Sequence, residues 1–155
     1  MEVENIVIKY SDTVYKIAYS MTRSRSDADD IFQDVFMKYF EKNIEFENEE
    51  YEKAWLIRVT INMCKMLYRK KSIRKEEELD ENMNISTNND DKSVLEYVRK
   101  LPIKYHSVIY LHYYEGYQVN EIAKMLKTTS GTIKSRLSRA RKLLQKNMEG
   151  EFNYE

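Results

Sequence analysis

The 155-residue sequence is poor in residues that cross-link a chain or cradle a phosphate. It contains a single cysteine, Cys64, which excludes an intrachain disulfide and a zinc site built from cysteines. Its three glycines are scattered, so there is no glycine-rich phosphate loop, and no nucleophile elbow is present. His106 and His112 are six residues apart and would point in different directions on a helix. We therefore expect no enzyme activity, no metal site and no cofactor.

Long apolar segments are also missing. No run approaches the ~20 apolar residues that cross a membrane. The N-terminus, MEVENIVIKYSD, lacks the basic region followed by a long apolar region that marks a signal peptide. These features predict a cytoplasmic protein without direct membrane insertion.

A net charge is absent too, because 26 basic residues balance 26 acidic ones. The balance hides an asymmetry along the chain. Residues 94–148 contain eleven lysines and arginines against three acidic residues, a net charge of +8, whereas residues 1–93 carry −5 and the tail 149–155 carries −3. Since the local field decides whether a polyanion is attracted, a basic C-terminal half and an acidic N-terminal half suggest two different partners.

The clearest motif lies near the C-terminus, in residues 120–144, NEIAKMLKTTSGTIKSRLSRARKLL. Apolar residues at helical spacing predict two helices joined by a short polar turn, with Ser130 as the cap of the second helix. The outer face of that helix is basic, and Gly131 leaves its start open to another backbone. This layout is typical of a helix-turn-helix that reads DNA, although a packed helical hairpin with a solvated basic face has the same pattern.

The apolar pattern of the N-terminal half predicts three helices. The first covers residues 4–22, and the second is a strongly amphipathic helix over 28–41 whose capping box pairs Ser26 with Asp29. Residues 41–53 break the apolar period and are expected to form a loop. The third helix, 51–71, has an apolar first half that includes Trp55 as a core residue and a cluster of basic residues at its end.

The segment 76–92 is acidic, rich in asparagine and nearly free of large apolar residues, as in flexible linkers. Helices are expected again over 93–115, with Pro102 opening one of them and the sequence Glu115-Gly116-Tyr117 ending it. We therefore expect an all-α fold with two small helical domains, residues 1–75 and 93–148. The flexible acidic linker 76–92 joins them, and a tail, 149–155, follows.

Four stretches together resemble bacterial RNA polymerase sigma factors of the extracytoplasmic-function (ECF) type. They are DADDIFQDVFMKYF, AWLIRVTINMCKMLYRKK, the pattern LPxxxxxVxxLxxxEG over 101–116, and EIAKMLKTTSGTIKSRLSRARKLL. The resemblance covers residues 5–147 with the motifs in order. It implies a protein that binds core polymerase and directs transcription initiation at promoters, with one domain recognising the −10 element and the other the −35 element.

The resemblance also assigns residues by position. It implies polymerase binding by Asp30, Gln33 and Asp34. It implies −10 recognition by the loop residues Asn43, Phe46 and Asn48, which would hold a flipped base, and by the helix residues Arg58, Asn62, Lys65, Arg69 and Lys70. It implies −35 recognition by Ser130, Gly131, Thr132, Lys134, Ser135, Arg136 and Arg139. Met66 departs from the family, which usually carries aspartate there.

Two other functions remain open on the residues alone. An autonomous helix-turn-helix regulator would dimerise on palindromic sites, but it would leave the acidic helix 28–41 and the basic helix end 65–75 without a role. A purely protein-binding helical module would show no salt-dependent DNA affinity, which the charge of +8 argues against. An inhibitory anti-sigma partner is common in the family, although no residue here specifies one.

Overall fold

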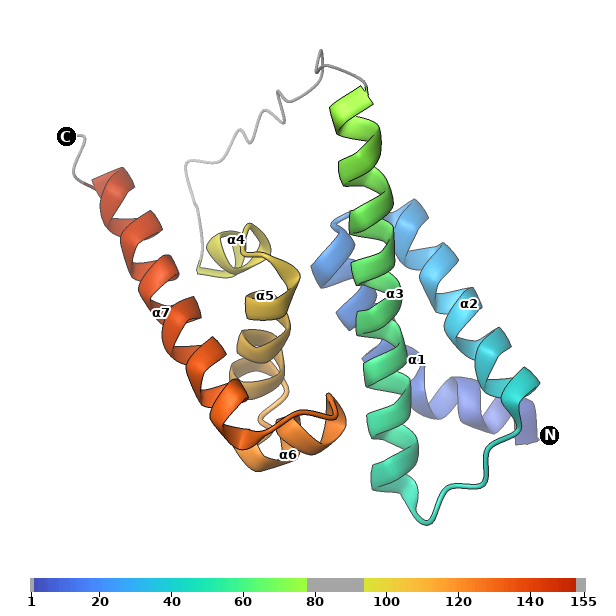
Figure 1. The fold of residues 1–155 in the computed structure, drawn as a ribbon. Coiled ribbons are helices and arrows are strands. Elements are labelled where there is room, and N and C mark those ends of the chain that lie inside the picture. The colour runs from blue at the N-terminus through green and yellow to red at the C-terminus, as the bar shows by residue number, and fades with distance from the viewer. Residues whose placement is uncertain (1, 78–93, 153–155) are drawn as a thin grey trace.

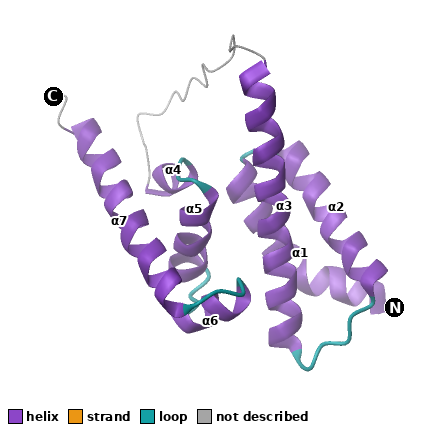
Figure 2. Ribbon diagram, viewed as in Figure 1, coloured by secondary structure: helices purple, strands orange, loops and turns teal. Residues whose placement is uncertain are grey.

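The computed structural model describes residues 2–77 and 94–152, and within these ranges every regular element is a helix (Figures 1 and 2). Three long helices come first: α1 (Glu2–Thr22), α2 (Arg25–Lys42) and α3 (Glu49–Glu77). Shorter helices follow, namely α4 (Val94–Arg99), α5 (Ile103–Ile109), the π-helix η1 (Tyr110–Tyr114) and α6 (Val119–Met125), and the long α7 (Ser130–Phe152) ends the described chain. The expected all-α fold is confirmed.

Helices α1, α2 and α3 form the N-terminal unit. Their apolar stripes meet in a core in which Val14, Ile17, Leu56 and Ile61 are fully buried. Removal of this apolar surface from water is the main stabilising contribution. Trp55 is buried here, as the sequence predicted.

The carboxylate of Glu52 ties the three helices together at the start of α3. It accepts hydrogen bonds from Tyr10 of α1 at 2.8 Å and from Tyr39 of α2 at 2.7 Å. Burial and the nearby Glu52 carboxylate raise the pKa of the Tyr10 phenol, so it remains a donor at neutral pH. The first turn of α3 therefore has a fixed position relative to both other helices.

Helices α4 to α7, with η1, form the C-terminal unit. Its core contains Leu111, Ile122, Ile133 and Leu137, all fully or almost fully buried. The chain turns between η1 and α6 at Gly116, whose φ of +78° lies in the left-handed region that glycine adopts without strain. This turn was predicted from the sequence, whereas the π-helix before it was not.

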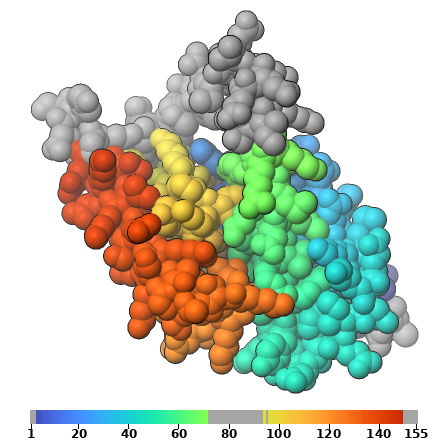
Figure 3. All heavy atoms as spheres, in the orientation of Figure 1, coloured from blue at the N-terminus to red at the C-terminus, as the bar shows by residue number. Residues whose placement is uncertain are grey.

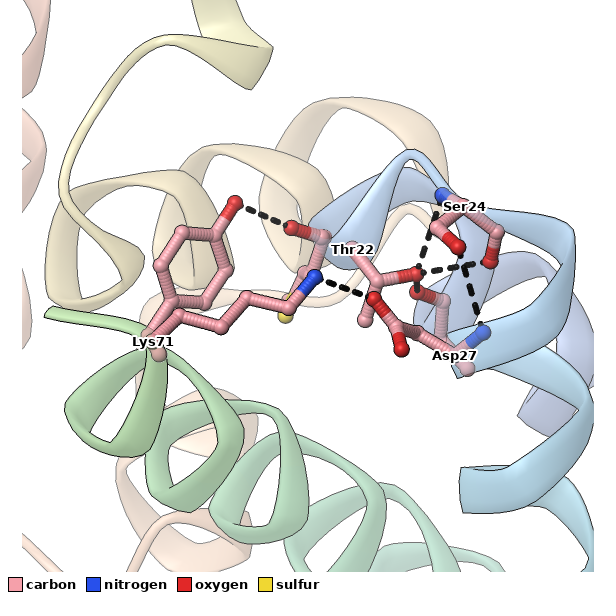
Figure 4. Close-up of polar contacts among 7 residues, drawn as sticks. Thr22, Ser24, Asp27 and Lys71 are labelled. Carbon is pink, nitrogen blue, oxygen red and sulfur yellow. Dashed lines mark hydrogen bonds and ion pairs between the residues drawn. The ribbon is translucent and has the colours of Figure 1, made fainter. Parts of the chain in front are cut away.

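The turn between α1 and α2 corrects the predicted capping box. Ser24 is the N-cap of α2, because its side-chain oxygen accepts the backbone N–H of Asp27 at 3.2 Å. Ser26, which was expected to cap, lies inside the helix and is exposed. Arg23 adopts a left-handed backbone conformation, φ +58°, which ends α1 at Thr22 as predicted, and α2 begins earlier than predicted. Figure 4 shows this cap beside an ion pair between Asp27 and Lys71 of α3.

The predicted loop 41–53 is shorter than expected, because helices take up both of its ends. Asn43 ends α2 in a left-handed conformation, with its N–H bonded to the Tyr39 carbonyl oxygen. Asn48 caps α3, since its side-chain oxygen accepts the N–H of Tyr51 at 3.0 Å. Only residues 43–48 remain outside the helices.

In two other places a helix is also longer than predicted. Helix α3 continues through residues 76 and 77, which were assigned to the linker, and residues 78–92 of the linker lie outside the described residues. Helix α7 continues through residues 149–152 of the expected tail, while 153–155 lie outside the described residues.

The cap of the second helix of the helix-turn-helix is also corrected. The Thr129 hydroxyl oxygen accepts the N–H of Thr132 at 3.2 Å, which makes Thr129 the cap in place of Ser130. Ser130 instead donates from its hydroxyl to the side-chain oxygen of Asn120 at 2.8 Å. That bond joins α7 to α6 and fixes the two helices of the motif relative to each other.

The two units pack against each other, with α6 and α5 against α3 and α5 against α1. In the space-filling view, α6 lies against α3 (Figure 3). Polar contacts between described residues cross the boundary. Ser20 and His106 approach to 3.0 Å between hydroxyl oxygen and Nε2, and Arg58 donates from Nη1 to the Met125 carbonyl oxygen at 3.4 Å.

Candidate nucleic-acid and polymerase interfaces

An acidic surface runs along the first half of α2. Its buried side includes Ala28, Ile31 and Val35, and the opposite side of the helix faces solvent. Asp30, Gln33 and Asp34, called the α2 face below, are all exposed. The structure thus brings the three sequence-predicted polymerase contacts together on one side of one helix.

Apolar side chains continue the α2 face toward the end of the helix. Met37 is 58% exposed and Phe40 is 38% exposed. Sequence reasoning did not select Met37. The sequence spacing could have identified it, because residues 30, 34 and 37 are three or four positions apart and therefore lie on the same side of a helix.

The loop 43–48 contains three side chains that were predicted to hold a flipped base. Asn43 and Asn48 are exposed, and they end and begin the flanking helices as described above. Phe46 is half-buried. Its ring stacks on Tyr39, with the ring centroids 6.1 Å apart, and meets the Trp55 ring edge-on, with the centroids 6.0 Å apart. Each residue therefore has a structural role in this loop, and their base-binding role stays a prediction.

A polar stripe follows one side of α3 at helical spacing. It consists of Arg58, Asn62, Lys65 and Arg69, and together with Lys70, which lies about 100° around the helix from Arg69, it is called the α3 stripe below. Asn62, Arg69 and Lys70 are exposed, whereas Arg58 and Lys65 are half-buried because the C-terminal unit lies against them. Burial first, and then the positive charges of Arg136 and Arg69, lower the pKa of Lys65.

A second cationic surface surrounds the start of α7. It is formed by Ser130, Gly131, Thr132, Lys134, Ser135, Arg136 and Arg139, called the α7 set below. A cavity of about 520 Å³ opens among several of these residues. Gly131 faces open space, since a side-chain carbon there would meet nothing nearer than the Thr129 hydroxyl oxygen at 4.0 Å. A backbone or a phosphate can therefore approach α7 closely at this point.

Sequence reasoning missed two residues of this cavity, Lys104 and Tyr105 of α5. A hydrogen bond from Arg139 lowers the pKa of the Tyr105 phenol, which ties α5 to the exposed face of α7. Lys104 adds a cation beside the α7 set from a helix 26 residues earlier in the chain. In the sequence, only its position in the basic C-terminal half indicated that it could belong to this surface.

The α3 stripe and the α7 set lie close together at the boundary between the units. Arg58 contacts the end of α6, and Arg136 is near enough to Lys65 to affect its pKa. Like charges at such a boundary repel one another, so this arrangement favours a negatively charged partner on both surfaces.

The described residues contain no group of three or more histidine, cysteine, aspartate or glutamate side chains arranged to hold a metal ion. Nor does any helix in residues 2–77 and 94–152 have the length and apolar content needed to span a membrane.

Comparison with known families gives two matches that follow each other along the chain. The family described as Sigma-70 region 2 matches residues 6–73, and that described as Sigma-70, region 4 matches residues 91–144. The first contains α1 to most of α3 with the α2 face and the α3 stripe. The second contains the helix-turn-helix with the α7 set.

Individual proteins are similar over nearly the whole chain. The ECF RNA polymerase sigma factor SigW of Bacillus subtilis is 27% identical over 164 residues, covering 93% of this chain and 87% of that protein. RNA polymerase sigma factor SigV of the same organism is 27% identical over 143 residues, covering 90% and 86%.

Solved structures share the fold. The sigma factor RpoE from Bartonella quintana, in complex with the anti-sigma factor NepR, aligns with a TM-score of 0.72 and 22% identity over 96% of this chain and 97% of that one. CnrH in complex with the cytosolic domain of CnrY aligns with a TM-score of 0.69 and 21% identity over 96% and 88%. At these identities the similarity concerns the fold.

Proposed function

Because the chain belongs to the sigma-70 family, as a promoter-specific RNA polymerase sigma factor of the ECF type, we propose how its two units divide this function. The N-terminal unit binds core polymerase and the −10 element, and the C-terminal unit binds the −35 element. The observation that carries the proposal is the presence of one acidic and two basic exposed surfaces on separate helices, in the order of the matched regions.

The α2 face is the polymerase contact. Asp30 and Asp34 are exposed carboxylates on a rigid helix, which suits a basic surface on the enzyme. Because both carboxylates lie one turn apart, they can pair with two cations of one partner helix. The apolar Met37 next to them would be covered in the same contact.

The α3 stripe binds the −10 element. Its cations suit the phosphates, and the amide of Asn62 supplies hydrogen-bonding groups for a base edge. Residues Asn43, Phe46 and Asn48 contribute from the preceding loop by holding an unstacked base. Stacking on Phe46 would require its ring to be accessible beside Tyr39 and Trp55.

The α7 set binds the −35 element in the major groove. The N-terminal residues of a recognition helix meet base edges, so Arg136 and Ser135 are the candidates for readout. Lys134 and Arg139 suit phosphate contacts, and Lys104 of α5 adds a further cation on the same side. An α-helix N-terminus also favours the negative charge of a phosphate near Gly131.

Further parts of the function follow from the family. The protein acts in the cytoplasm, where it meets polymerase, and the polymerase rather than this chain carries out the chemistry. An anti-sigma protein is proposed as a partner, since the structurally similar sigma factor RpoE was solved in complex with the anti-sigma factor NepR.

Run-off transcription with bacterial core polymerase tests the proposal. Genomic fragments of the source organism are transcribed with and without this protein, and discrete new start sites are expected only when it is present. Start sites aligned to shared −10 and −35 sequences support the division of function. Absence of core binding in a co-purification assay would overturn it.

A further inference from the structure

A second cavity, of about 350 Å³, lies where the two units meet on the side of α1. Tyr15 and Tyr19 contribute from α1, Arg99 from α4, and Tyr110 and Tyr114 from η1. This volume is in the range of small-molecule sites. None of these five residues belongs to the α2 face, the α3 stripe or the α7 set, so the sigma-factor function leaves this cavity without a role.

The walls of the cavity are aromatic. The rings of Tyr15 and Tyr19 stack with centroids 6.2 Å apart and planes 10° apart, and those of Tyr110 and Tyr114 stack at 5.6 Å and 24°. The second pair stands on a π-helix, an element that is rare and is frequently found at functional sites. Stacked tyrosines from both units present flat apolar surfaces that suit a planar ring.

The charge of the lining is positive. The Arg99 guanidinium carbon lies 6.0 Å from the centre of the Tyr19 ring, and its Nε is buried without a hydrogen-bond partner in the described part of the chain. Lys16 adds an exposed ammonium group, and no acidic residue lines the cavity. The guanidinium and the ammonium group together favour an anionic group in the cavity.

We propose that this cavity binds a small planar aromatic anion, with its ring against the tyrosines and its anionic group on Arg99 and Lys16. Since α1 and η1 belong to different units, a ligand held between them stabilises the contact between the units. The adjoining hydrogen bond between Ser20 and His106 belongs to the same contact. The ligand therefore favours the arrangement in which α6 covers part of α3.

Binding is tested with two probes, 2-naphthoate and guanosine monophosphate, which separate a carboxylate from a phosphate as the anionic group. Isothermal titration calorimetry should give saturable binding with one site for at least one probe, and the uncharged 2-naphthamide should bind at least tenfold more weakly. Saturable binding of neither probe, or equal binding of the amide, would overturn the proposal.

Variants locate the site. Arg99→Gln should weaken binding at least tenfold, because it removes the charge-assisted hydrogen bonds. Tyr114→Ala should weaken it about fivefold through lost stacking, and since Tyr114 is 47% exposed, this change should leave the fold intact. Tyr113→Ala is the matched control, because Tyr113 is 55% exposed and does not line the cavity. Wild-type affinity in Tyr114→Ala, or an equal loss in Tyr113→Ala, would contradict the assigned site.

The coupling to the contact between the units rests on the proposed function and has its own readout. Run-off transcription by the wild type should fall as the probe is added, whereas Tyr114→Ala should need about five times more probe for the same fall. A probe that binds without lowering wild-type transcription would overturn the coupling. Failure to transcribe without any probe would instead overturn the proposed function, which the calorimetric result does not depend on.

Discussion

His106 lies in the contact between the two units, where 1% of the residue is exposed and its Nε2 is 3.0 Å from the Ser20 hydroxyl oxygen. Burial, followed by the positive charges of Arg99 and Arg23, lowers its pKa to about 4. Its ring is therefore neutral at physiological pH. Protonation would place a positive charge in a buried site that already faces two arginines.

The pH dependence of stability follows from this residue. The unfolded chain takes up a proton near the ordinary pKa of 6.5, whereas the folded protein does so only near 4. The free energy of unfolding should therefore rise between about pH 4 and 6.5, by up to ~3 kcal/mol, and stay level above that range. Urea denaturation at several pH values measures this slope.

The matched variant for this measurement is His106→Gln, which keeps a hydrogen-bonding group but cannot titrate. It should reduce the pH slope between 4 and 6.5, whereas His112→Gln should leave the contribution of His106 in place. An unchanged slope in His106→Gln would contradict the assignment, since carboxylates would then account for all of the pH dependence.

Arg136 lies at the start of α7 and is the side chain proposed to read the −35 element. Arg136→Ala should lose ~1–3 kcal/mol of discrimination between a matched and a scrambled −35 sequence if the guanidinium contacts a base. Arg141→Ala removes the same charge from an exposed position of the same helix, outside the α7 set, and should change both affinities equally. Start-site usage in competitive run-off transcription gives the ratio.

At the scale of single helices, the structure and the sequence pattern assign the N-cap of α2 to different residues, Ser24 and Ser26. Ser24→Ala should lower the free energy of unfolding by ~1 kcal/mol, because the N–H of Asp27 loses its acceptor. Ser26→Ala should have little effect, since Ser26 is exposed within the first turn. Chemical denaturation of the two variants compares the caps directly, and a larger loss in Ser26→Ala would restore the capping box that the sequence suggested.

The exposed side of α2 can be tested separately from its stability. Asp34→Lys should weaken co-purification with core polymerase about tenfold or more, because it replaces an attraction by a repulsion in the contact. Asp12→Lys makes the same charge change at an exposed position on α1 and should bind as the wild type does. Equal retention of core by the two variants would remove the assigned polymerase role of the α2 face.

Periodicity predicted most elements because their apolar stripes are strong. The first two helices, the buried Trp55 and the helix-turn-helix were all found in this way. Caps were less predictable, since Ser24 and Ser26 are chemically equal and the left-handed Arg23 decides between them. The π-helix had no sequence signal, because its residues continue the helical pattern of α5.

The arrangement of the two units could not be derived from periodicity either. Contacts such as Ser20 with His106 join residues that are 86 positions apart, and no local pattern reports them. For the same reason Lys104 was missed, although it lines the same cavity as the α7 set. Exposure of the α2 face and the α7 set, by contrast, followed directly from which sides of the helices were apolar.

For the whole molecule, the spacing of the two promoter elements sets a geometric requirement. Positions −35 and −10 are about 25 base pairs apart, or ~85 Å at ~3.4 Å per pair. In the structure Arg136 and Lys65 are close enough for one charge to affect the other. If the α3 stripe binds the −10 element and the α7 set binds the −35 element, as proposed above, this arrangement cannot reach both, and we expect the two units to separate on the promoter.

Fluorescence energy transfer measures this separation. Labels placed at Glu41→Cys on α2 and Lys146→Cys on α7 occupy exposed positions, and Cys64 is buried and should not react. Energy transfer should fall when core polymerase and promoter DNA are added together. Undiminished transfer in an actively transcribing complex would contradict the assignment of the two elements to the two units.

The link between the start of α2 and the end of α3 has a mechanical consequence. Lys71 pairs with Asp27, and the Tyr68 hydroxyl donates to the Met21 carbonyl oxygen at 2.7 Å (Figure 4). Asp27 is one turn of helix before Asp30, and Lys71 directly follows the α3 stripe. On the proposed roles of α2 and α3, this link would set the distance between the polymerase surface that binds the α2 face and the DNA that binds the α3 stripe. Loosening this link would let that distance vary, although it removes no side chain from the α2 face or the α3 stripe.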